Sequence, residues 1–221
     1  MDEKHLVEVL LNELLPLSVI EDIKLGIPLV PEAYDEVTIY FSDIVSFTKI
    51  SASLSPMDVV SMLNMMYTLF DDISTEFEVY KIATIGDAYF VASGVPIPNG
   101  DDHAMEICRM SLELLHAVSY CPVPHARGES IKLRIGVHTG PVVAGIAGIK
   151  MPRYMLFGDT VDIAEKLEAE GESSRVHVSE TTVAILNAKG GFQFESHNSL
   201  NIKGIGVIKT FWLKECGAAY K

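Results

Sequence analysis

The stretch Val37-Thr38-Ile39-Tyr40-Phe41-Ser42-Asp43-Ile44-Val45 decides the fold of this chain, together with a second one, Ile82-Ala83-Thr84-Ile85-Gly86-Asp87-Ala88-Tyr89-Phe90-Val91. β-Branched and aromatic residues dominate both stretches, which predicts two buried strands. Each strand ends near an aspartate, where a carboxylate is costly unless a cation meets it. If the carboxylates of Asp43 and Asp87 converge, they form a hard oxygen site that suits Mg²⁺ carrying a phosphate substrate.

Each aspartate also has an ordinary structural interpretation. Asp43 can cap a following helix, and Gly86-Asp87 can form a tight turn between two strands. Separation in the sequence does not show that the two carboxylates meet, so both interpretations stay open at this point.

Composition indicates an acidic globular protein. The 221 residues predict one large domain or a domain with a short appendage, and 48% hydrophobic residues support a substantial core. The net charge of −13 argues against nucleic acid and anionic lipid headgroups as partners. Cys108, Cys121 and Cys216 show no metal or redox spacing, which fits a reducing compartment. No apolar run reaches the length of a membrane span, and no signal peptide is visible.

The order of elements predicts an α+β fold. Strands are expected at 37–43, 79–85, 88–93 and 131–138, and helices at 56–76 and 102–119. This β-α-β-β-α-β order describes a ferredoxin-like sheet with its helices on one face. A helical segment or linker is expected over 1–30, where Pro16 interrupts a stripe of leucines and Gly26 ends it, and the main domain over 31–221.

The C-terminal part is expected to elaborate this sheet. Gly140-Pro141 is expected to turn the chain into segment 142–146, and short strands near 176–178 and 207–213 to frame a helix near 180–187. A further helix near 159–170 carries acidic residues whose ordinary interpretation is a solvated face: Asp162, Glu165, Glu168 and Glu170.

Five motifs, in order along the chain, resemble those of the class III nucleotidyl cyclases, and most of all the catalytic domains of receptor-type guanylyl cyclases. They are FSDIVSFT (41–48), TIGDAY (84–89), RIGVHTG (134–140), MPRY (151–154) and LFGDTV (156–161). The resemblance runs from about residue 12 to 214. It implies the class III cyclase fold and a cyclase catalytic domain over 31–221.

In that family two catalytic domains pair head to tail and form composite sites at their interface. The resemblance implies that Asp43 and Asp87 are metal ligands, with the Ile44 carbonyl as a third oxygen, for two Mg²⁺ or Mn²⁺ ions per site. The ions would help the ribose 3′ oxygen to attack the α-phosphorus of a nucleoside triphosphate while pyrophosphate leaves.

The resemblance also implies phosphate-binding groups. Backbone amides of Phe47 and Thr48, at the turn into a helix, would cradle phosphate. Arg134 would face the triphosphate, and Lys203 would reach the triphosphate bound to the other domain. Without the motifs, Arg134 and Lys203 would be interpreted as surface cations at strand ends.

Four positions depart from the family pattern. Ala83 and Met155 stand where guanylyl cyclases have a guanine-reading glutamate and a cysteine, and adenylyl cyclases have lysine and aspartate or threonine. Asp162 stands where the family has a transition-state asparagine, and Lys166 where it has an arginine. A carboxylate has the wrong sign beside an anionic substrate, and lysine lacks the planar fork of arginine. Asp162 and Lys166 are also spaced to pair with each other on one helix.

The family pattern is therefore kept unequally. The metal-binding part, Asp43, Asp87 and Arg134, is complete, whereas only Lys203 remains of the residues that one domain supplies to the site of its partner. This favours a guanylyl cyclase subunit that donates the metal-binding half of a site to a partner domain, as some family members divide labour. A catalytically inactive regulatory or dimerisation module, and an active homodimer with relaxed base choice, stay open. The resemblance implies a cytosolic domain whose parent protein is anchored at a membrane.

Overall fold

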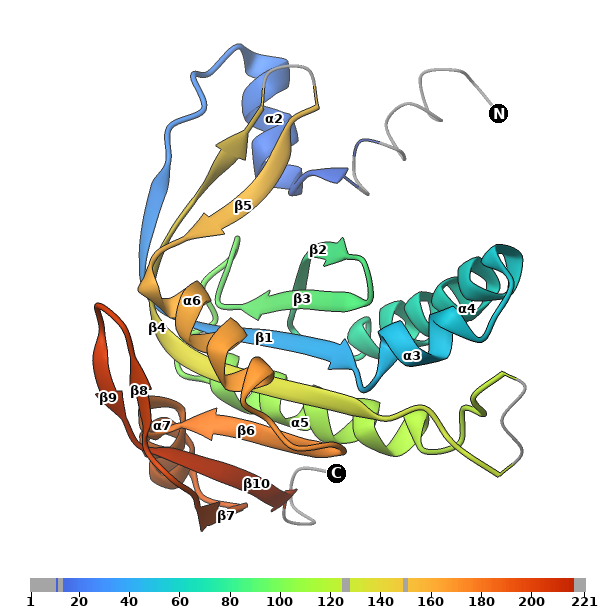
Figure 1. Cartoon of the computed structure of the whole chain (residues 1–221). Coiled ribbons are helices and arrows are strands. Elements are labelled where there is room, and N and C mark those ends of the chain that lie inside the picture. Colours follow the sequence, from blue (N-terminus) through green and yellow to red (C-terminus); the bar gives the residue numbers. More distant parts are fainter. Residues whose placement is uncertain (1–10, 12–13, 125–127, 149–150, 217–221) are drawn as a thin grey trace.

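A computed structural model describes residues 11, 14–124, 128–148 and 151–216. Its centre is an eight-stranded sheet in the order β2-β3-β1-β4-β6-β10-β7, with β5 paired to β4 (Figure 1). The strands are β1 Glu32–Ile44, β2 Tyr80–Ile85, β3 Ala88–Ser93, β4 Leu133–Ala147, β5 Arg153–Phe157, β6 Arg175–Ser179, β7 Phe192–Ser196 and β10 Thr210–Cys216. The first four pair antiparallel as β2-β3-β1-β4, which confirms the predicted ferredoxin-like arrangement.

Helices cover both faces of this sheet. The larger apolar cluster packs three helices, α4 Pro56–Ser74, α5 Asp102–Val118 and α7 Glu180–Lys189, against one face. Helix α6, Asp159–Ala169, lies against β4 and β1 on the other face, next to a second apolar cluster. The expectation of helices on one face therefore holds for α4 and α5, and α6 is an addition. No described helix combines the length and apolar character that crossing a bilayer requires.

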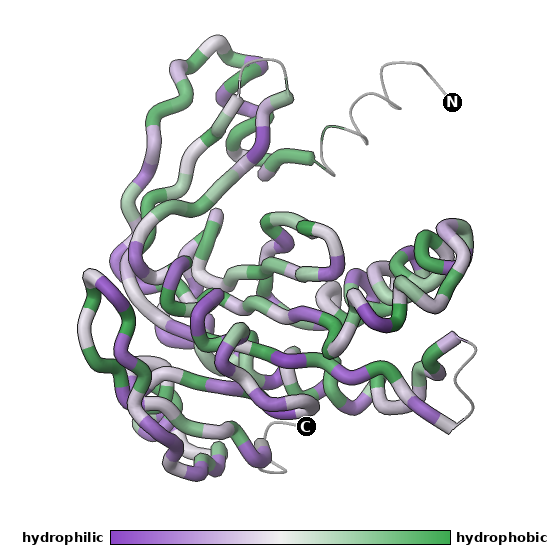
Figure 2. Tube along the Cα trace, viewed as in Figure 1, coloured by the Kyte–Doolittle hydropathy of each residue, from purple (hydrophilic) through white to green (hydrophobic). Residues whose placement is uncertain are grey.

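Helix α4 follows the sequence prediction closely. The Ser55 hydroxyl accepts a hydrogen bond from the Asp58 N–H at 3.2 Å, and Pro56 occupies the first helical position. Its buried stripe consists of Met62, Met66 and Phe70. The opposite side keeps apolar residues exposed, including Met57, and Figure 2 shows apolar colour along this helix at the edge of the molecule.

The N-terminal prediction is tested only in part. Helix α2, Leu17–Leu25, starts after Pro16, and Gly26 ends it in the left-handed conformation at φ 68°. Leu15 and Ile20 are buried, whereas Leu14 and Leu17 of the predicted stripe are exposed. Leu6 and Leu10 lie outside the described residues.

The predicted turn at Gly140-Pro141 is wrong. Strand β4 runs through both residues for 15 residues, and its outer part bends away to pair with β5 (Figure 1). The pairing of β1 with β4 shifts register between Tyr34 and Val37, so a bulge in β1 faces Pro141. Pro141 has no N–H and cannot donate a hydrogen bond to the neighbouring strand. Because the bulge leaves the facing residues of β1 unpaired, no ladder hydrogen bond is needed from Pro141 and the strand continues.

The expected strand at 207–213 is divided in two. Strands β8 Leu200–Ile202 and β9 Gly206–Ile208 form a separate two-stranded hairpin, and β10 begins at Thr210. The sequence prediction also missed β5, β7 and the short helix α3, Phe47–Ala52. These elements are too short for a periodic pattern to indicate.

Helix α6 approaches β4 so closely that no side chain fits between them at Gly136. A Cβ atom there would lie 2.2 Å from the Glu168 nitrogen and 2.4 Å from the Ala164 carbonyl oxygen. Backbone atoms cannot move aside as a flexible side chain can, so the glycine sets the height of the helix above the sheet.

We expect Gly136→Ala to lower the free energy of unfolding by ~3 kcal/mol or more, because it overpacks a backbone contact. Gly145→Ala is the matched control on the same strand, where the nearest atoms are 3.5 Å away on Pro31. Urea denaturation monitored by circular dichroism measures both. Equal midpoints for the two variants would contradict the packing argument.

Candidate active site

The end of β1 places one carboxylate beside one guanidinium. Asp43 and Arg134 are direct cross-strand neighbours of β1 and β4. Arg134 Nη2 lies 3.0 Å from Asp43 Oδ2, and the Ile44 N–H donates to Asp43 Oδ1 at 2.9 Å. The Ile44 side chain is buried. Pairing on one face of the sheet thus fixes the direction of the Asp43 carboxylate.

Asp87 meets Asp43. It follows Gly86, whose φ of 64° makes the tight turn between β2 and β3. Burial, first, and then a side-chain contact with the Asp43 carboxylate raise the pKa of Asp87 to about 7, against the opposing effect of the Asp87 and Ile44 N–H groups. The question left open by the sequence is therefore answered, because the two carboxylates converge.

Helix α4 holds the turn that carries Asp87. The Tyr67 hydroxyl donates to the Gly86 carbonyl oxygen. Lys81 Nζ contacts the Asp71 carboxylate at 2.7 Å and lies over the Tyr89 ring at 5.3 Å from its centre. These contacts join the α4 surface to both strands of the hairpin, so the position of Asp87 depends on α4.

The sequence did not predict Glu168 as a site residue, because it was expected on the solvated face of α6. The expected solvated face holds for Asp162, Glu165 and Glu170, which are exposed, but Glu168 is buried and its Oε1 lies 3.0 Å from Arg134 Nε. Burial raises the pKa of Glu168 to about 7, although Arg134 opposes the shift. A signal was present, because Glu168 shares the buried helical stripe with Thr160 and Ala164.

The predicted phosphate cradle is the start of α3. Phe47 begins this helix and is half-buried against the larger core, while Thr48 is exposed. The preceding residue, Ser46, has a φ of 61°, a left-handed conformation that costs a residue with a side chain ~1 kcal/mol. The turn is thus strained at the point where it bends from β1 into α3. Its phosphate role stays a prediction.

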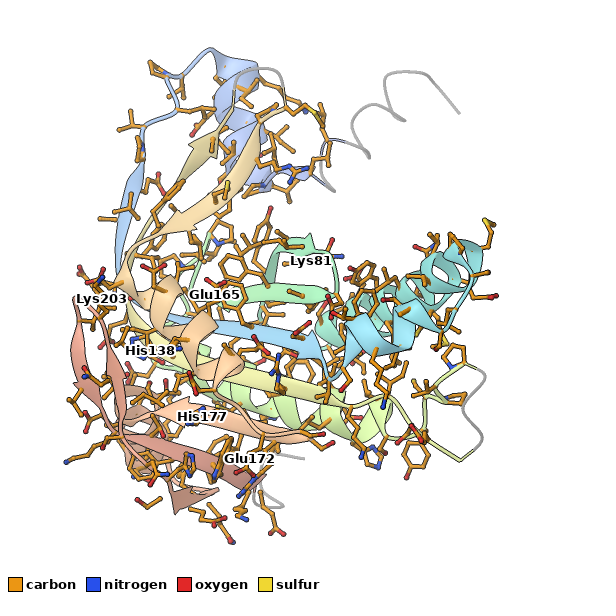
Figure 3. All side chains as sticks on the ribbon, in the orientation of Figure 1. Lys81, His138, Glu165, Glu172, His177 and Lys203 are labelled. Carbon is orange, nitrogen blue, oxygen red and sulfur yellow. The ribbon has the colours of Figure 1, made fainter. Side chains whose placement is uncertain are left out.

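The residues predicted to serve the site of a partner domain are not part of the Asp43–Arg134 cluster. Lys203 is exposed on the turn of the β8–β9 hairpin, at the edge of the molecule and apart from the tip of β1, which lies nearer the middle (Figures 1 and 3). Asp162 is exposed in the first turn of α6. The predicted pairing of Lys166 with Asp162 is wrong, because Lys166 Nζ instead contacts Glu170 Oε1 at 2.7 Å. Glu170 is the C-cap residue beyond the helix, so its side chain can fold back.

The two base-reading positions lie on neighbouring elements. Ala83 is half-buried on β2, and Met155 is partly exposed on β5. Tyr80 of β2 and Tyr154 of β5 contact each other edge to face, with ring centres 5.5 Å apart. Neither Ala83 nor Met155 offers a side-chain group able to hydrogen-bond a purine edge.

The predicted site residues thus fall into two groups: the metal half, defined as Asp43, Asp87 and Arg134, which the structure brings together, and the complementary half, defined as Ala83, Met155, Asp162, Lys166 and Lys203. Residues 29–215 match the family model of the adenylate and guanylate cyclase catalytic domain. The chain belongs to this family.

Among curated relatives, the chain is 52% identical over 213 residues to the atrial natriuretic peptide receptor 2 of Homo sapiens, covering 96% of the chain and 20% of the receptor. It is 51% identical to the receptor-type guanylate cyclase Gyc76C of Drosophila melanogaster, covering 96% of the chain and 14% of that protein. The chain thus spans a fifth or less of these relatives, and it is similar to their cyclase domains.

Solved structures of guanylyl cyclase domains are also similar to this chain. The guanylate cyclase domain of RhGC from Catenaria anguillulae in complex with GTP is 35% identical, with a TM-score of 0.77 over 84% of this chain and 99% of that one. A dimeric guanylyl cyclase domain of the RhoGC fusion protein from Blastocladiella emersonii is 32% identical, with a TM-score of 0.75 over 84% and 99%.

The shared carboxylates of Asp43 and Asp87 predict a pH dependence of stability without added metal. The pKa of Asp87 is raised from 3.8 to about 7 in the folded chain, so the folded state binds the extra proton. Its stabilising contribution is full below the unfolded pKa and is lost as pH rises through about 7.

We expect Asp87→Asn to raise the free energy of unfolding at pH 8 by at most ~1 kcal/mol, since Asp87 is partly exposed, and to remove this pH dependence. The exposed Asp72 on α4 supplies the control, Asp72→Asn. Denaturation curves from pH 4 to 8 with a chelator present test this. A parent whose stability rises with pH over that range relative to Asp87→Asn would contradict it.

Proposed function

We propose that this chain is a guanylyl cyclase domain, converting GTP to cyclic GMP and pyrophosphate, and that it donates the metal half of a composite site in a heterodimer. The observation that carries the proposal is the convergence of Asp43 and Asp87 beside Arg134, while the complementary half lies apart and is altered. Similarity to receptor guanylyl cyclases supports the choice of reaction.

The metal half fits a hard divalent cation. It offers carboxylate oxygens from Asp43 and Asp87, which are the donors that Mg²⁺ and Mn²⁺ prefer. Among the described residues no cluster of three or more histidine, cysteine, aspartate or glutamate side chains forms a ready-made metal cage. Such a pair suits Mg²⁺ or Mn²⁺ bound with nucleotide, because the Ile44 carbonyl, water and phosphate oxygens would complete the ligands of two ions. When bound, the ions activate the ribose hydroxyl and stabilise the leaving pyrophosphate.

The chain's own residues bind and orient the nucleotide. Arg134 presents its guanidinium to the triphosphate, and Glu168 holds that guanidinium from the other side at 3.0 Å. The backbone amides of Phe47 and Thr48, at the start of α3, would contact phosphate oxygens. Fixed positive groups of this kind act on charge that develops during phosphoryl transfer.

The complementary half cannot serve a second copy of the same chain equally well. Asp162 would bring a carboxylate towards an anionic substrate, and Lys166 is paired with Glu170 rather than free for phosphate. Ala83 and Met155 leave guanine without polar partners. A partner domain with polar base-reading residues, asparagine and arginine at these positions would complete one productive site.

We infer further that the domain works on the cytosolic side of a membrane-anchored parent. The basis is the similarity to proteins named as receptors and receptor-type cyclases, of which the cyclase domain is a fifth or less.

A complementation experiment tests the division of labour. The chain is mixed with a guanylyl cyclase domain that keeps its base-reading and transition-state residues but has both metal aspartates changed to alanine. We expect cyclic GMP formation with Mn²⁺, abolished by Asp43→Ala in this chain. Lys203→Ala in this chain should be silent, because the partner supplies the lysine of the only complete site. Loss of activity with Lys203→Ala, or activity that survives Asp43→Ala, would refute the assignment.

The chain alone should make very little cyclic GMP. Losing a preorganised transition-state donor costs ~3 kcal/mol, which is roughly a hundredfold or more in rate. The fourfold variant Ala83→Glu, Met155→Cys, Asp162→Asn and Lys166→Arg should restore a homodimeric guanylyl cyclase, with non-additive single effects. Robust activity of the unaltered chain would favour a homodimer with relaxed base choice. A folded, dimeric and inactive fourfold variant would favour an inactive regulatory module.

A further inference from the structure

The hairpin that carries Lys203 depends on few contacts for its position. Strands β8 and β9 form their own two-stranded sheet. The hairpin rests on α6 through a small apolar cluster, in which Ile163 and Leu167 of the helix meet Ile202. Both its ends must therefore be fixed by other interactions if Lys203 is to keep one place.

A single buried imidazole connects these ends to helix α6. His177 of β6 is fully buried, with Nδ1 2.9 Å from the Leu167 carbonyl oxygen and Nε2 2.8 Å from Thr210 Oγ1. The Thr210 hydroxyl also lies 2.6 Å from the Asn198 carbonyl oxygen, which it can reach as a donor. Asn198 precedes the hairpin and Thr210 follows it. Figure 3 shows His177 and Lys203 on the same side of the molecule.

We propose that His177 is the positioning residue of the complementary half: its neutral ring fixes the Lys203 hairpin relative to helix α6, and a second proton loosens that link. The role of Lys203 as a phosphate contact in the other composite site of a dimer rests on the proposed function, whereas the link itself does not.

The count of hydrogen atoms and the cost of a buried charge act in opposite directions on the protonation of the link. The three contacts among Leu167, His177, Thr210 and Asn198 need three hydrogens to be hydrogen bonds. A neutral imidazole has one N–H and the Thr210 hydroxyl has one O–H, so two hydrogens serve three contacts. One contact then opposes two lone pairs, which is costly in a buried place. An imidazolium would supply the third hydrogen, but it would also bury a positive charge in a fully buried place, and the lowered pKa of His177 shows that this cost is the larger of the two.

The surroundings of His177 set its protonation. Burial lowers the pKa of His177, and the nearby His197 lowers it as well, while the Leu167 carbonyl, Glu170 and Glu172 raise it. The Trp212 ring packs on the imidazole at 4.5 Å, and the Arg175 guanidinium covers the far side of this region at 4.4 Å from the Trp212 ring centre. The pKa of His177 is thus lowered in the folded chain, so the buried ring is neutral near pH 7 and a second proton favours states in which the ring is less buried. The link therefore loosens as the solution becomes acidic.

Amide hydrogen exchange of the whole chain tests the link without nucleotide or partner. Thr210→Val keeps the shape of the side chain and removes the hydroxyl. We expect exchange at residues 200–208 to become about tenfold faster or more, as for the loss of a buried hydrogen bond. Exchange in β2 and β3 should not change. Thr182→Val is the matched control, because Thr182 is an equally buried threonine whose hydroxyl contacts Thr139 at 2.8 Å, away from the hairpin.

The pH profile separates positioning from simple packing. After correction for intrinsic rates, exchange at 200–208 in the parent should become faster as pH falls from 8 to 5.5, and His177→Asn should lose this dependence. Nitrogen chemical shifts of the His177 ring should show the neutral Nδ1–H form at pH 8. Equal hairpin exchange in Thr210→Val and Thr182→Val, or a flat profile in the parent, would overturn the proposal.

The outcome is independent of the cyclase proposal. If Asp43→Ala proves silent in the complementation assay while Thr210→Val frees the hairpin, the proposed function fails and the link stands. If the complementation experiment succeeds and the hairpin does not respond to Thr210→Val, the link fails and the function stands.

Discussion

Helix α6 lies against β4 with bare backbone at Gly136, where an added Cβ would lie 2.2 Å from the Glu168 nitrogen. This contact sets where both ends of the helix fall. Near its C-terminus Glu168 reaches Arg134, and near its start the Thr160 hydroxyl donates to the Pro141 carbonyl at 2.6 Å. The Leu167 carbonyl faces His177 on the next strand. One helix thus orients a residue of the metal half and carries two positions of the complementary half.

The metal half gathers more negative than positive charge. The carboxylates of Asp43 and Glu168 contact the guanidinium of Arg134, and the carboxylate of Asp87 in turn contacts Asp43. The pKa values of Asp87 and Glu168 are both raised to about 7, first by burial and then by their acidic neighbour Asp43. A triphosphate would be repelled by such a group unless divalent cations accompanied it. The electrostatics therefore agree with the oxygen-donor chemistry, since each carboxylate is costly without a cation and useful with one.

The sequence predicted the elements whose residue pattern is local. Alternating and β-branched residues indicated β1 to β4, and Ser55-Pro56 indicated the start of α4 within one residue. The sequence-based prediction failed where the local structure depends on contact with a strand that is distant in the sequence. Pro141 continues a strand only because a bulge in β1 faces it, and Glu168 is buried only because Gly136 admits the helix. Asp43 and Asp87 could be named from motifs, but their convergence required the pairing of β1 with β3.

The charges also bear on which dimer the chain can form productively. In a dimer of two identical chains, each composite site would add the Asp162 carboxylate of one copy to the three acidic groups of the other. Lys166 would not offset it, because its ammonium is held by Glu170 at 2.7 Å. A partner with a neutral amide at that position removes one negative charge from the site, and an arginine adds a forked donor that lysine cannot mimic. The same substitutions would leave the metal half intact, since neither Asp162, which is exposed, nor Lys166, which pairs with Glu170, contributes to the contacts of Asp43 described above. Under the proposed function, the change of two side chains on one helix would thus turn a site that two identical chains could share into one that favours a different partner.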